Sequence, residues 1–353
     1  MSTGETIGVG VIGLGFIGSA HLAAYRRGAR DGFGCEVRAV YDPRLLDSKG
    51  AADIAVTGNL ESQRGDADAD PAGVRHCSSL NDLLDDPAIS LVSICTPTAT
   101  HVEVACRALR AGKHVLVEKP LCLRAADAEP LLREAAARPD RIVMPGFCMR
   151  FWPGWDTLLE FIRNGSLGPV HSAVFGRLGS RPTWSETYAD DALTGGALVD
   201  LHTHDADFVR ACFGDPASVM SGGSLDHVTT IYRFSNGPAH VVAEGAWDHR
   251  GGWPFRMRFV VAFDEATAEF DSGRDEQLRI SRGGKTVPIK LEPRSGWENE
   301  IRALMAVLAG RRPRSDLPAL HDAHAVATLL ERERESVQTG RSVRFEPPRP
   351  LNP

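Results

Sequence analysis

Residues 7–18 read IGVGVIGLGFIG, an apolar run that leads directly into glycines spaced G-x-G-x-x-G. A short, nearly all-apolar run of this kind is typical of a buried parallel strand, and a helical pattern follows it. In such a strand–turn–helix unit Gly13 permits the tight turn, Gly15 lets the backbone approach a pyrophosphate, and Gly18 lets the helix pack closely on the strand. The stretch therefore predicts a dinucleotide-binding α/β domain. The alternative is a glycine-rich turn without a ligand.

The rest of the first third of the chain alternates short apolar runs with helical patterns, which is typical of β-α units around a parallel sheet. The predicted strands are Ile7–Ile12, Glu36–Tyr41, Leu91–Cys95, His114–Val117 and Ile142–Met144. The predicted helices are Val102–Leu109 and Ala125–Ala137, and Glu61–Pro71 is expected to be a solvated acidic excursion.

An acidic residue, Asp42, directly follows the second predicted strand. At that position a carboxylate hydrogen-bonds the adenosine ribose of a dinucleotide and repels a 2′-phosphate, which favours NAD over NADP. Arg44 lies two residues further on and could instead accept such a phosphate. The alternative interpretation is that Asp42 only begins a turn with Pro43.

From about Arg150 the pattern changes to one helix followed by many short β-rich runs. The helix is predicted at Thr194–Phe213, and the runs are Ser218–Gly222, His227–Phe234, Ala239–Ala246, Arg256–Phe263, Ala268–Asp271, Leu278–Ser281 and Thr286–Leu291. Gly, Asn and Asp between the runs predict an antiparallel sheet of meanders, in which Arg256–Phe263 is apolar enough to be buried on both faces. Helices at Glu298–Leu308 and Pro318–Thr339 close this α+β domain, and a frayed tail is expected at residues 347–353.

Length and composition restrict the class of protein. The chain has 353 residues and a mass of 38.2 kDa, which predicts about two domains. Its net charge of −6 argues against a nucleic-acid or anionic-membrane partner. The seven cysteines are scattered singly, which indicates reduced thiols in a cytoplasm. Residues 6–25 carry no formal charge, but five glycines and His21 argue against a signal peptide or membrane span.

Four motifs occur in order along the chain: the strand–GLGFIG–helix unit, CTPTATH at 95–101, VEKP at 117–120 and GGALVDLHTHDAD at 195–207. With the stretch at 146–151 and the closing helices, they resemble the glucose-fructose oxidoreductase, inositol dehydrogenase and MocA (Gfo/Idh/MocA) family over nearly the whole chain. The resemblance implies an α/β fold: an NAD-binding Rossmann domain at 1–147, then an α+β domain at 148–346 with a large, open, mainly antiparallel sheet. The closing helix at 318–339 could pack back on the Rossmann domain.

The resemblance also implies which residues bind the cofactor. At the adenosine and pyrophosphate end they are Gly13, Gly15, Phe16, Ile17, Gly18 and Asp42, and at the nicotinamide end they are Thr96, Pro97, Thr98, His101, Glu118 and Lys119. Many family members carry Asn where this chain has Thr98. Family members use the Lys of the Glu-Lys-Pro turn to hold the reacting hydroxyl, and the peptide bond before Pro120 is often cis.

Oxidation of an alcohol removes a hydride from carbon and a proton from oxygen. The nicotinamide accepts the hydride, and a side chain with a pKa near neutrality must accept the proton. His204 fits that role, and Asp200 stands four residues before it, on the same face of the predicted helix. We expect Asp200 to orient His204 and favour its protonated form, while Lys119 polarises the hydroxyl. The alternative is a buried core histidine without a chemical role.

Neighbouring residues raise the question of a metal site. His202 and His204 flank one residue next to Asp205, but side chains at i and i+2 diverge by about 200° around a helix and cannot hold one ion. No metal is expected, and His202 is interpreted as a packing or subunit-contact residue. For substrate we predict Arg150, Arg177, Trp184 and Tyr188, each of which could instead be an ordinary surface or core residue.

The sequence thus predicts an NAD-dependent oxidoreductase that acts on a secondary hydroxyl of a sugar, sugar acid or cyclic polyol, with NADP the less favoured cofactor. Two alternatives stay open: an NAD-retaining glycoside hydrolase of the same fold, and a non-catalytic dinucleotide sensor. The expected partner is a small polyhydroxylated substrate, not nucleic acid or a membrane. The resemblance further suggests a homodimer or homotetramer formed through the second sheet.

Overall fold

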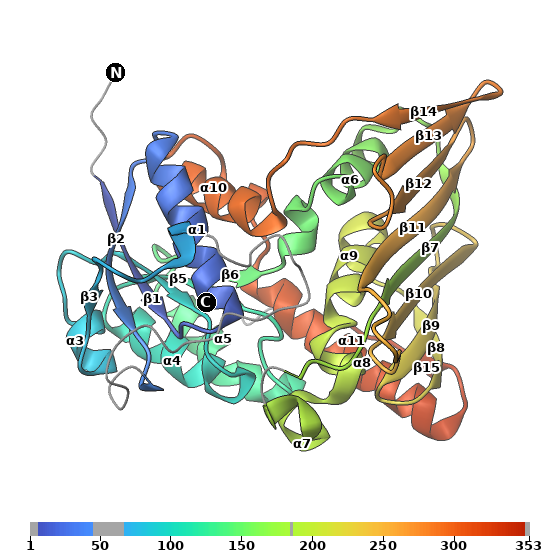
Figure 1. Cartoon of the computed structure of the whole chain (residues 1–353). Helices are drawn as coiled ribbons and strands as arrows, with labels where there is room; N and C mark the ends of the chain where they lie inside the picture. Colours follow the sequence, from blue (N-terminus) through green and yellow to red (C-terminus); the bar gives the residue numbers. More distant parts are fainter. Residues whose placement is uncertain (1–5, 45–66, 184–185, 350–353) are drawn as a thin grey trace.

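A computed structural model of the chain describes residues 6–44, 67–183 and 186–349. A six-stranded sheet forms the N-terminal half (Figure 1). Its strands are β1 (Ile7–Ile12), β2 (Cys35–Tyr41), β3 (Arg75–His76), β4 (Leu91–Ile94), β5 (His114–Glu118) and β6 (Val143–Gly146). They are all parallel, in the order β3-β2-β1-β4-β5-β6. This is the Rossmann order, in which ligands bind at the carboxyl ends of the strands where the order reverses, here between β1 and β4.

Helices cover both faces of this sheet. The flanking helices are α1 (Phe16–Arg30), α3 (Leu80–Leu84), α4 (Thr98–Arg110), α5 (Glu129–Ala136) and α10 (Gly296–Leu308). Although α10 comes late in the chain, it packs beside α1 (Figure 1), and Ile301 and Leu304 share a core with Val9 and Val11. Its start is fixed by a capping box in which the hydroxyl of Ser295 accepts the backbone N–H of Glu298.

A nine-stranded sheet forms the second half. Its strands are β7 (Val170–Leu178), β8 (Ser218–Gly223), β9 (His227–Arg233), β10 (His240–Ala246), β11 (Arg256–Phe263), β12 (Thr267–Asp271), β13 (Leu278–Arg282), β14 (Lys285–Ile289) and β15 (Val343–Arg344). The order is β14-β13-β12-β11-β7-β10-β9-β8-β15, and only the β7–β10 pair is parallel. The predicted fold class, a Rossmann domain followed by an α+β domain with a large, mainly antiparallel sheet, is therefore confirmed.

Helices cover one face of the second sheet. They are α6 (Trp155–Asn164), α9 (Thr203–Phe213) and α11 (Leu320–Thr339), and Figure 1 shows the opposite face without a helix. Trp155 lies at the centre of the enclosed core, with its ring 4.9 Å from that of Phe208 and 5.4 Å from that of Phe259. The prediction that Arg256–Phe263 is buried on both faces is wrong. Burial alternates along β11, and Val260 is 46% exposed, because only one face of the sheet is covered.

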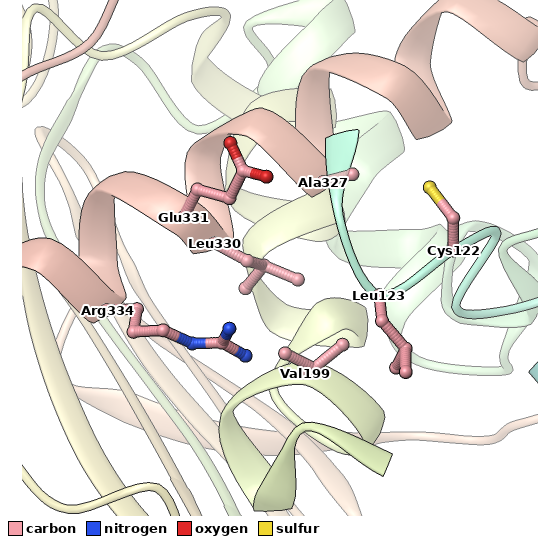
Figure 2. A pocket seen from close by; sticks show the side chains of 7 residues that line it. All are labelled: Cys122, Leu123, Val199, Ala327, Leu330, Glu331 and Arg334. Atoms are coloured by element: carbon pink, nitrogen blue, oxygen red, sulfur yellow. The ribbon is translucent and has the colours of Figure 1, made fainter. Parts of the chain in front are cut away.

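The helix α11 contacts both halves of the molecule. Figure 2 shows Ala327 and Leu330 of α11 facing Cys122 and Leu123, which follow β5, and Val199 of the second half. A hydrogen bond from the backbone N–H of Ala125 to Oε1 of Glu331 (2.9 Å) fixes the same contact. Consequently the turn after β5 lies against both α11 and Val199.

The predicted helix Thr194–Phe213 is wrong as a single element. It divides into α7 (Asp191–Thr194), α8 (Gly196–Asp200) and α9. Gly195 and Gly196 have φ values of 75° and 72°, a left-handed conformation that ends α7 and that residues other than glycine rarely adopt.

The structure also contains α6, β7, β3 and β15, which were not predicted. Of the acidic excursion Glu61–Pro71, only residues 67–71 lie among the described residues. No helix in the described part of the chain is long and apolar enough to cross a membrane.

Candidate active site

The glycine turn after β1 is shaped by close backbone approach. Gly13 has a φ of 88°, and a Cβ atom there would lie 2.6 Å from the carbonyl oxygen of Cys95. A Cβ on Gly18 would lie 1.8 Å from the carbonyl oxygen of Gly13, so only glycine fits at either position. Gly15 differs, since a Cβ there would meet nothing within 4 Å. The open space is therefore at the glycine that is expected to face a ligand.

The first turn of α1 completes this cradle. Gly15 is its N-cap and provides no side-chain hydrogen bond, so backbone N–H groups at the helix start remain available for an anion. Phe16 packs edge-on against Trp297, with ring centroids 5.8 Å apart, and Ile17 is half-buried beside it. A pyrophosphate fits this donor set, because the N-terminus of a helix attracts negative charge.

Asp42 lies directly beside the cradle. Its Oδ2 accepts the backbone N–H of Leu14 (2.8 Å), while its Oδ1 accepts the backbone N–H and the Nε–H of Arg44, both at 2.9 Å. Burial acts to raise the pKa of Asp42, but the hydrogen bonds from Arg44 and Leu14 lower it, and the net pKa is lowered. Asp42 is therefore a carboxylate that is fixed by the glycine turn and covered by Arg44.

The residues predicted to bind the nicotinamide end of the cofactor lie at the carboxyl ends of β4 and β5. Pro97 is the N-cap of α4, which begins at Thr98. His101 is buried, and its ring nitrogens lie 2.7 Å from the carbonyl oxygen of Thr96 and 2.9 Å from that of Pro120. His101 thus ties the loop after β4 to the turn after β5. The Lys119–Pro120 peptide bond is cis, as the family resemblance implies.

Glu118 is buried at the end of β5. Its Oε2 accepts the backbone N–H of Lys119 (3.1 Å), and its Oε1 lies 3.0 Å from Nε2 of His21. Lys119 itself reaches the second domain. Its ammonium donates to the backbone carbonyl of Asp200 (2.8 Å) and lies 3.4 Å from the carboxylate of that residue. The two side chains are 14% and 18% exposed, so the pair is shielded without being sealed from solvent.

His204 is placed on the first turn of α9. Burial lowers its pKa well below the usual range, and the charges of Lys119 and Arg177 lower it further. Its Nδ1 is buried without a hydrogen-bond partner in the described part of the chain. The expectation that Asp200 would favour the protonated form of His204 is wrong, because the carboxylate faces Lys119 and the imidazole is held neutral. A neutral imidazole is the form that can accept a proton.

The neighbouring His202 has a different environment. It is completely buried, and its Nε2 lies 3.1 Å from both the hydroxyl of Tyr232 and a carboxylate oxygen of Glu333. Burial alone would lower its pKa, but Glu333 more than offsets this effect, so the pKa is raised. His202 is therefore a packing residue inside its own chain that links α9 to α11 and β9.

The residues predicted to bind substrate differ in their burial and in the groups that they contact. The guanidinium of Arg150 pairs with Asp207 (2.5 Å) and with Asp322 (3.1 Å), and that of Arg177 pairs with Asp205 (3.0 Å). Arg177 is buried, whereas the side chain of Arg150 is 13% exposed. Tyr188 lies edge-on to Trp247 at 6.0 Å. Trp184 lies outside the described residues.

Sequence reasoning did not identify a buried cluster behind Glu118, made by His21 of α1 and Glu300 of α10. Atoms of these three residues that could bind a metal lie within 4.8 Å of one another, and this is the one such group found among the described residues. The only signal for His21 was a polar residue inside an otherwise apolar helix start. Glu300 gave no signal, because the contact between α10 and α1 cannot be read from local sequence.

Two family models match the chain. Residues 7–147 match the oxidoreductase family with an NAD-binding Rossmann fold, and residues 155–269 match the GFO/IDH/MocA C-terminal domain. Myo-inositol 2-dehydrogenase of Thermotoga maritima is 25% identical, over 96% of this chain and 98% of that protein. Levoglucosan dehydrogenase of Pseudarthrobacter phenanthrenivorans is 27% identical, over 78% of this chain and 76% of that protein.

Solved structures agree in fold. Levoglucosan dehydrogenase in complex with NADH and levoglucosan superposes with a TM-score of 0.77, at 23% identity, over 96% of this chain and 99% of the other. GenD2 from gentamicin A biosynthesis, in complex with NAD, superposes with a TM-score of 0.76, at 25% identity, over 98% of both chains. The glycine cradle and Asp42 thus lie in an NAD-binding Rossmann domain.

Proposed function

The chain belongs to the Gfo/Idh/MocA oxidoreductase family, and from this premise we propose that it is an NAD-dependent dehydrogenase that oxidises a secondary hydroxyl group of a sugar, sugar acid or cyclic polyol. The observation that carries the proposal is the Lys119–Asp200 contact beside a half-buried, neutral His204. This group stands where the turn after β5 meets the second domain, at the edge of the NAD-binding sheet.

The division of labour follows from the chemistry of each group. NAD, held by the glycine cradle and Asp42, supplies the hydride acceptor. The ammonium of Lys119 has three N–H donors, so it can keep its bond to Asp200 and still donate to a substrate hydroxyl. The hydrogen bond from Lys119 to the substrate lowers the pKa of the substrate hydroxyl. Neutral His204 accepts the proton as the carbonyl forms, and its low pKa favours release of the proton to solvent.

The proposed substrate class rests on the relatives and on the polar character of the site. Relatives that align over most of this chain are named for dehydrogenation of myo-inositol and levoglucosan, both polyhydroxylated rings. Arg150, with a side chain 13% exposed and held by two aspartates, is a fixed donor for a ring hydroxyl or a carboxylate. Glu118 is proposed to bind the nicotinamide riboside, together with the loop from Thr96 to Thr98.

The experiment that tests the function follows NADH absorbance while the purified protein meets NAD and a panel of inositols, aldoses, anhydrosugars and sugar acids. We expect NADH to accumulate with one substrate class, and NADPH to accumulate more slowly when NADP replaces NAD. The matched control is His204→Asn, which retains a polar side chain of similar size but no base. Absence of NADH across the panel, with cleavage of a glycoside by protein that retains NAD, would replace this proposal with the hydrolytic one.

We also propose that the protein is a homo-oligomer that associates through the open face of the second sheet. Val174 and Val260 are paired across β7 and β11 on this face and are 43% and 46% exposed, and Met220 of β8 is 50% exposed. Contiguous apolar residues on one face favour association with a second copy. Light scattering should give a dimer or larger for the wild type and a monomer for Val260→Glu.

The free state of all seven cysteines supports a reducing, cytoplasmic location.

A further inference from the structure

Among the residues that the structure describes, two glutamates are completely buried, and their surroundings differ. Glu333 of α11 accepts hydrogen bonds from the hydroxyls of Tyr232 (2.8 Å) and Thr230 (3.1 Å), and lies 3.1 Å from Nε2 of His202. Glu300 of α10 is equally buried, yet neither of its carboxyl oxygens has a hydrogen-bond partner in the described part of the chain. A buried carboxylate without hydrogen-bond donors is costly. Ionisation therefore costs more free energy at Glu300 than at Glu333.

No fixed cation faces Glu300 among the described residues. The titratable groups around it are His21 and Tyr25 of α1, Cys95 after β4, Glu118 of β5 and Cys148 after β6. Nε2 of His21 lies 3.8 Å from Oε1 of Glu300, beyond hydrogen-bond distance. Burial and the nearby Glu118 carboxylate raise the pKa of Glu300 well above its usual range.

The hydrogen bonds of His21 show which carboxyl group of the cluster is ionised. The hydroxyl of Ser93 lies 2.9 Å from that of Tyr25 and 3.1 Å from Nδ1 of His21, and Nε2 of His21 lies 3.0 Å from Glu118. One arrangement gives Tyr25, Ser93, His21 and Glu118 a partner each: Tyr25 donates to Ser93, Ser93 donates to Nδ1, and the Nε2–H of His21 donates to Glu118. The Sγ of Cys95 also lies 3.5 Å from Nδ1 and can only add a second donor to it. Glu118 also accepts the backbone N–H of Lys119 (3.1 Å), so both of its oxygens act as acceptors. Glu118 is therefore the carboxylate of the pair.

We propose that Glu300 is a protonated, neutral carboxyl group, and that Glu300 and His21 are positioning residues that hold the Glu118 carboxylate, and with it the backbone of Lys119, at the nicotinamide end of the site. The carboxyl groups of Glu118 and Glu300 have oxygens within 4.8 Å of each other. Two buried carboxyl groups this close carry one negative charge between them, because the second ionisation would have no counter-charge. A neutral Glu300 closes the back of the cluster without repelling Glu118. The proposal rests on the proposed function only for the place of Glu118 and Lys119 beside the cofactor.

The first test measures the proton directly. Infrared difference spectra at neutral pH, wild type minus Glu300→Gln, should show the carbonyl stretching band of a protonated carboxylic acid. The matched control is Glu333→Gln, whose difference spectrum should instead show loss of a carboxylate band, because Glu333 accepts hydroxyl hydrogen bonds. Absence of the acid band in the first difference spectrum overturns the proposal. This measurement needs neither substrate nor turnover, so its outcome is independent of the proposed function.

The second test uses unfolding as a function of pH. A carboxyl group whose pKa is raised on folding stabilises the protein below its unfolded pKa, and this contribution is lost as the pH rises through the folded pKa. Between about pH 5 and about pH 9 the denaturant midpoint of the wild type should therefore fall more than that of Glu300→Gln. The amide is neutral throughout and should fold. Failure of Glu300→Gln to fold, while Glu333→Gln folds, would contradict a neutral Glu300.

The third test addresses positioning. Glu300→Ala should weaken NAD binding by about tenfold, whereas Glu300→Gln should restore the dissociation constant to within about threefold of the wild type, because the amide replaces the neutral acid. Glu118→Gln should not be rescued in this way, since its carboxylate must accept two donors. One equivalent of a divalent metal in the purified protein, lost in Glu300→Gln, would instead show that His21, Glu118 and Glu300 ligate a cation and would overturn the proposal.

Discussion

The ammonium of Lys119 donates a hydrogen bond to the backbone carbonyl of Asp200 at 2.8 Å and lies 3.4 Å from the carboxylate of the same residue. This contact joins the end of β5 in the Rossmann domain to the end of α8 in the second domain. The position of Lys119 therefore depends on both domains, as does the place of any hydroxyl group that it binds.

The two acceptors on Asp200 can be separated by substitution. Asp200→Asn retains the backbone carbonyl and the size of the side chain but removes the negative charge that opposes the ammonium. We expect kcat to fall by about tenfold, because a charge-assisted contact is lost while the main hydrogen bond stays. Lys119→Met should lower kcat by about 10²-fold or more, since the donor to the hydroxyl is gone. Equal losses in steady-state assays of the two variants would mean that Asp200 itself contacts the reacting atoms.

The two histidines of the His-Thr-His sequence should respond differently to the same substitution. His204→Asn removes the proposed base, so kcat should fall by about 10²- to 10⁴-fold while the dissociation constant for NAD is retained. His202→Asn removes a partner of buried Glu333 and should instead lower the free energy of unfolding by about 1–3 kcal/mol. Denaturant unfolding together with steady-state kinetics distinguishes these outcomes. A His204 variant with normal turnover would rule out its role as the base.

The pH dependence of oxidation follows from the lowered pKa of His204. The neutral imidazole is the active form of a base, so kcat/KM should rise as the pH increases through this pKa and then level off. Because the pKa lies below 6.5, this rise should be complete before neutral pH. In Lys119→Met one of the charges that lower the pKa is absent, so the acidic limb of the residual activity should move toward higher pH. An acidic limb at or above neutral pH in the wild type would contradict a His204 that is held neutral by its surroundings.

Most of the Rossmann half could be predicted to within a few residues because β1, β4 and β5 are buried on both faces and read as nearly continuous apolar runs. The observed β2, Cys35–Tyr41, and β5, His114–Glu118, extend the predicted strands by one residue each. In the second half β7 went unpredicted, because one face of its sheet is uncovered and the polar residues of VHSAVFGRL obscure the pattern. Residues at strand ends, such as Asp42 and Lys119, were predictable since parallel strands bring their carboxyl ends to one edge. Partners such as Asp205 for Arg177 were not, because a long-range ion pair leaves no local signal.

We expect the contact between Asp42 and Arg44 to set the preference for NAD over NADP. The guanidinium of Arg44 contacts both oxygens of the Asp42 carboxylate, and its side chain is 60% exposed and able to turn toward a ligand. Asp42→Asn removes the charge that repels a 2′-phosphate, keeps an acceptor for the backbone N–H of Leu14, and leaves Arg44 in place to pair with the phosphate. We expect the ratio of kcat/KM for NADP to that for NAD to rise by about tenfold to a hundredfold, which corresponds to about 1.4–2.8 kcal/mol. Adding Arg44→Ala to Asp42→Asn should reverse most of the gain. If that second substitution has no effect, the preference is set by residues other than this pair.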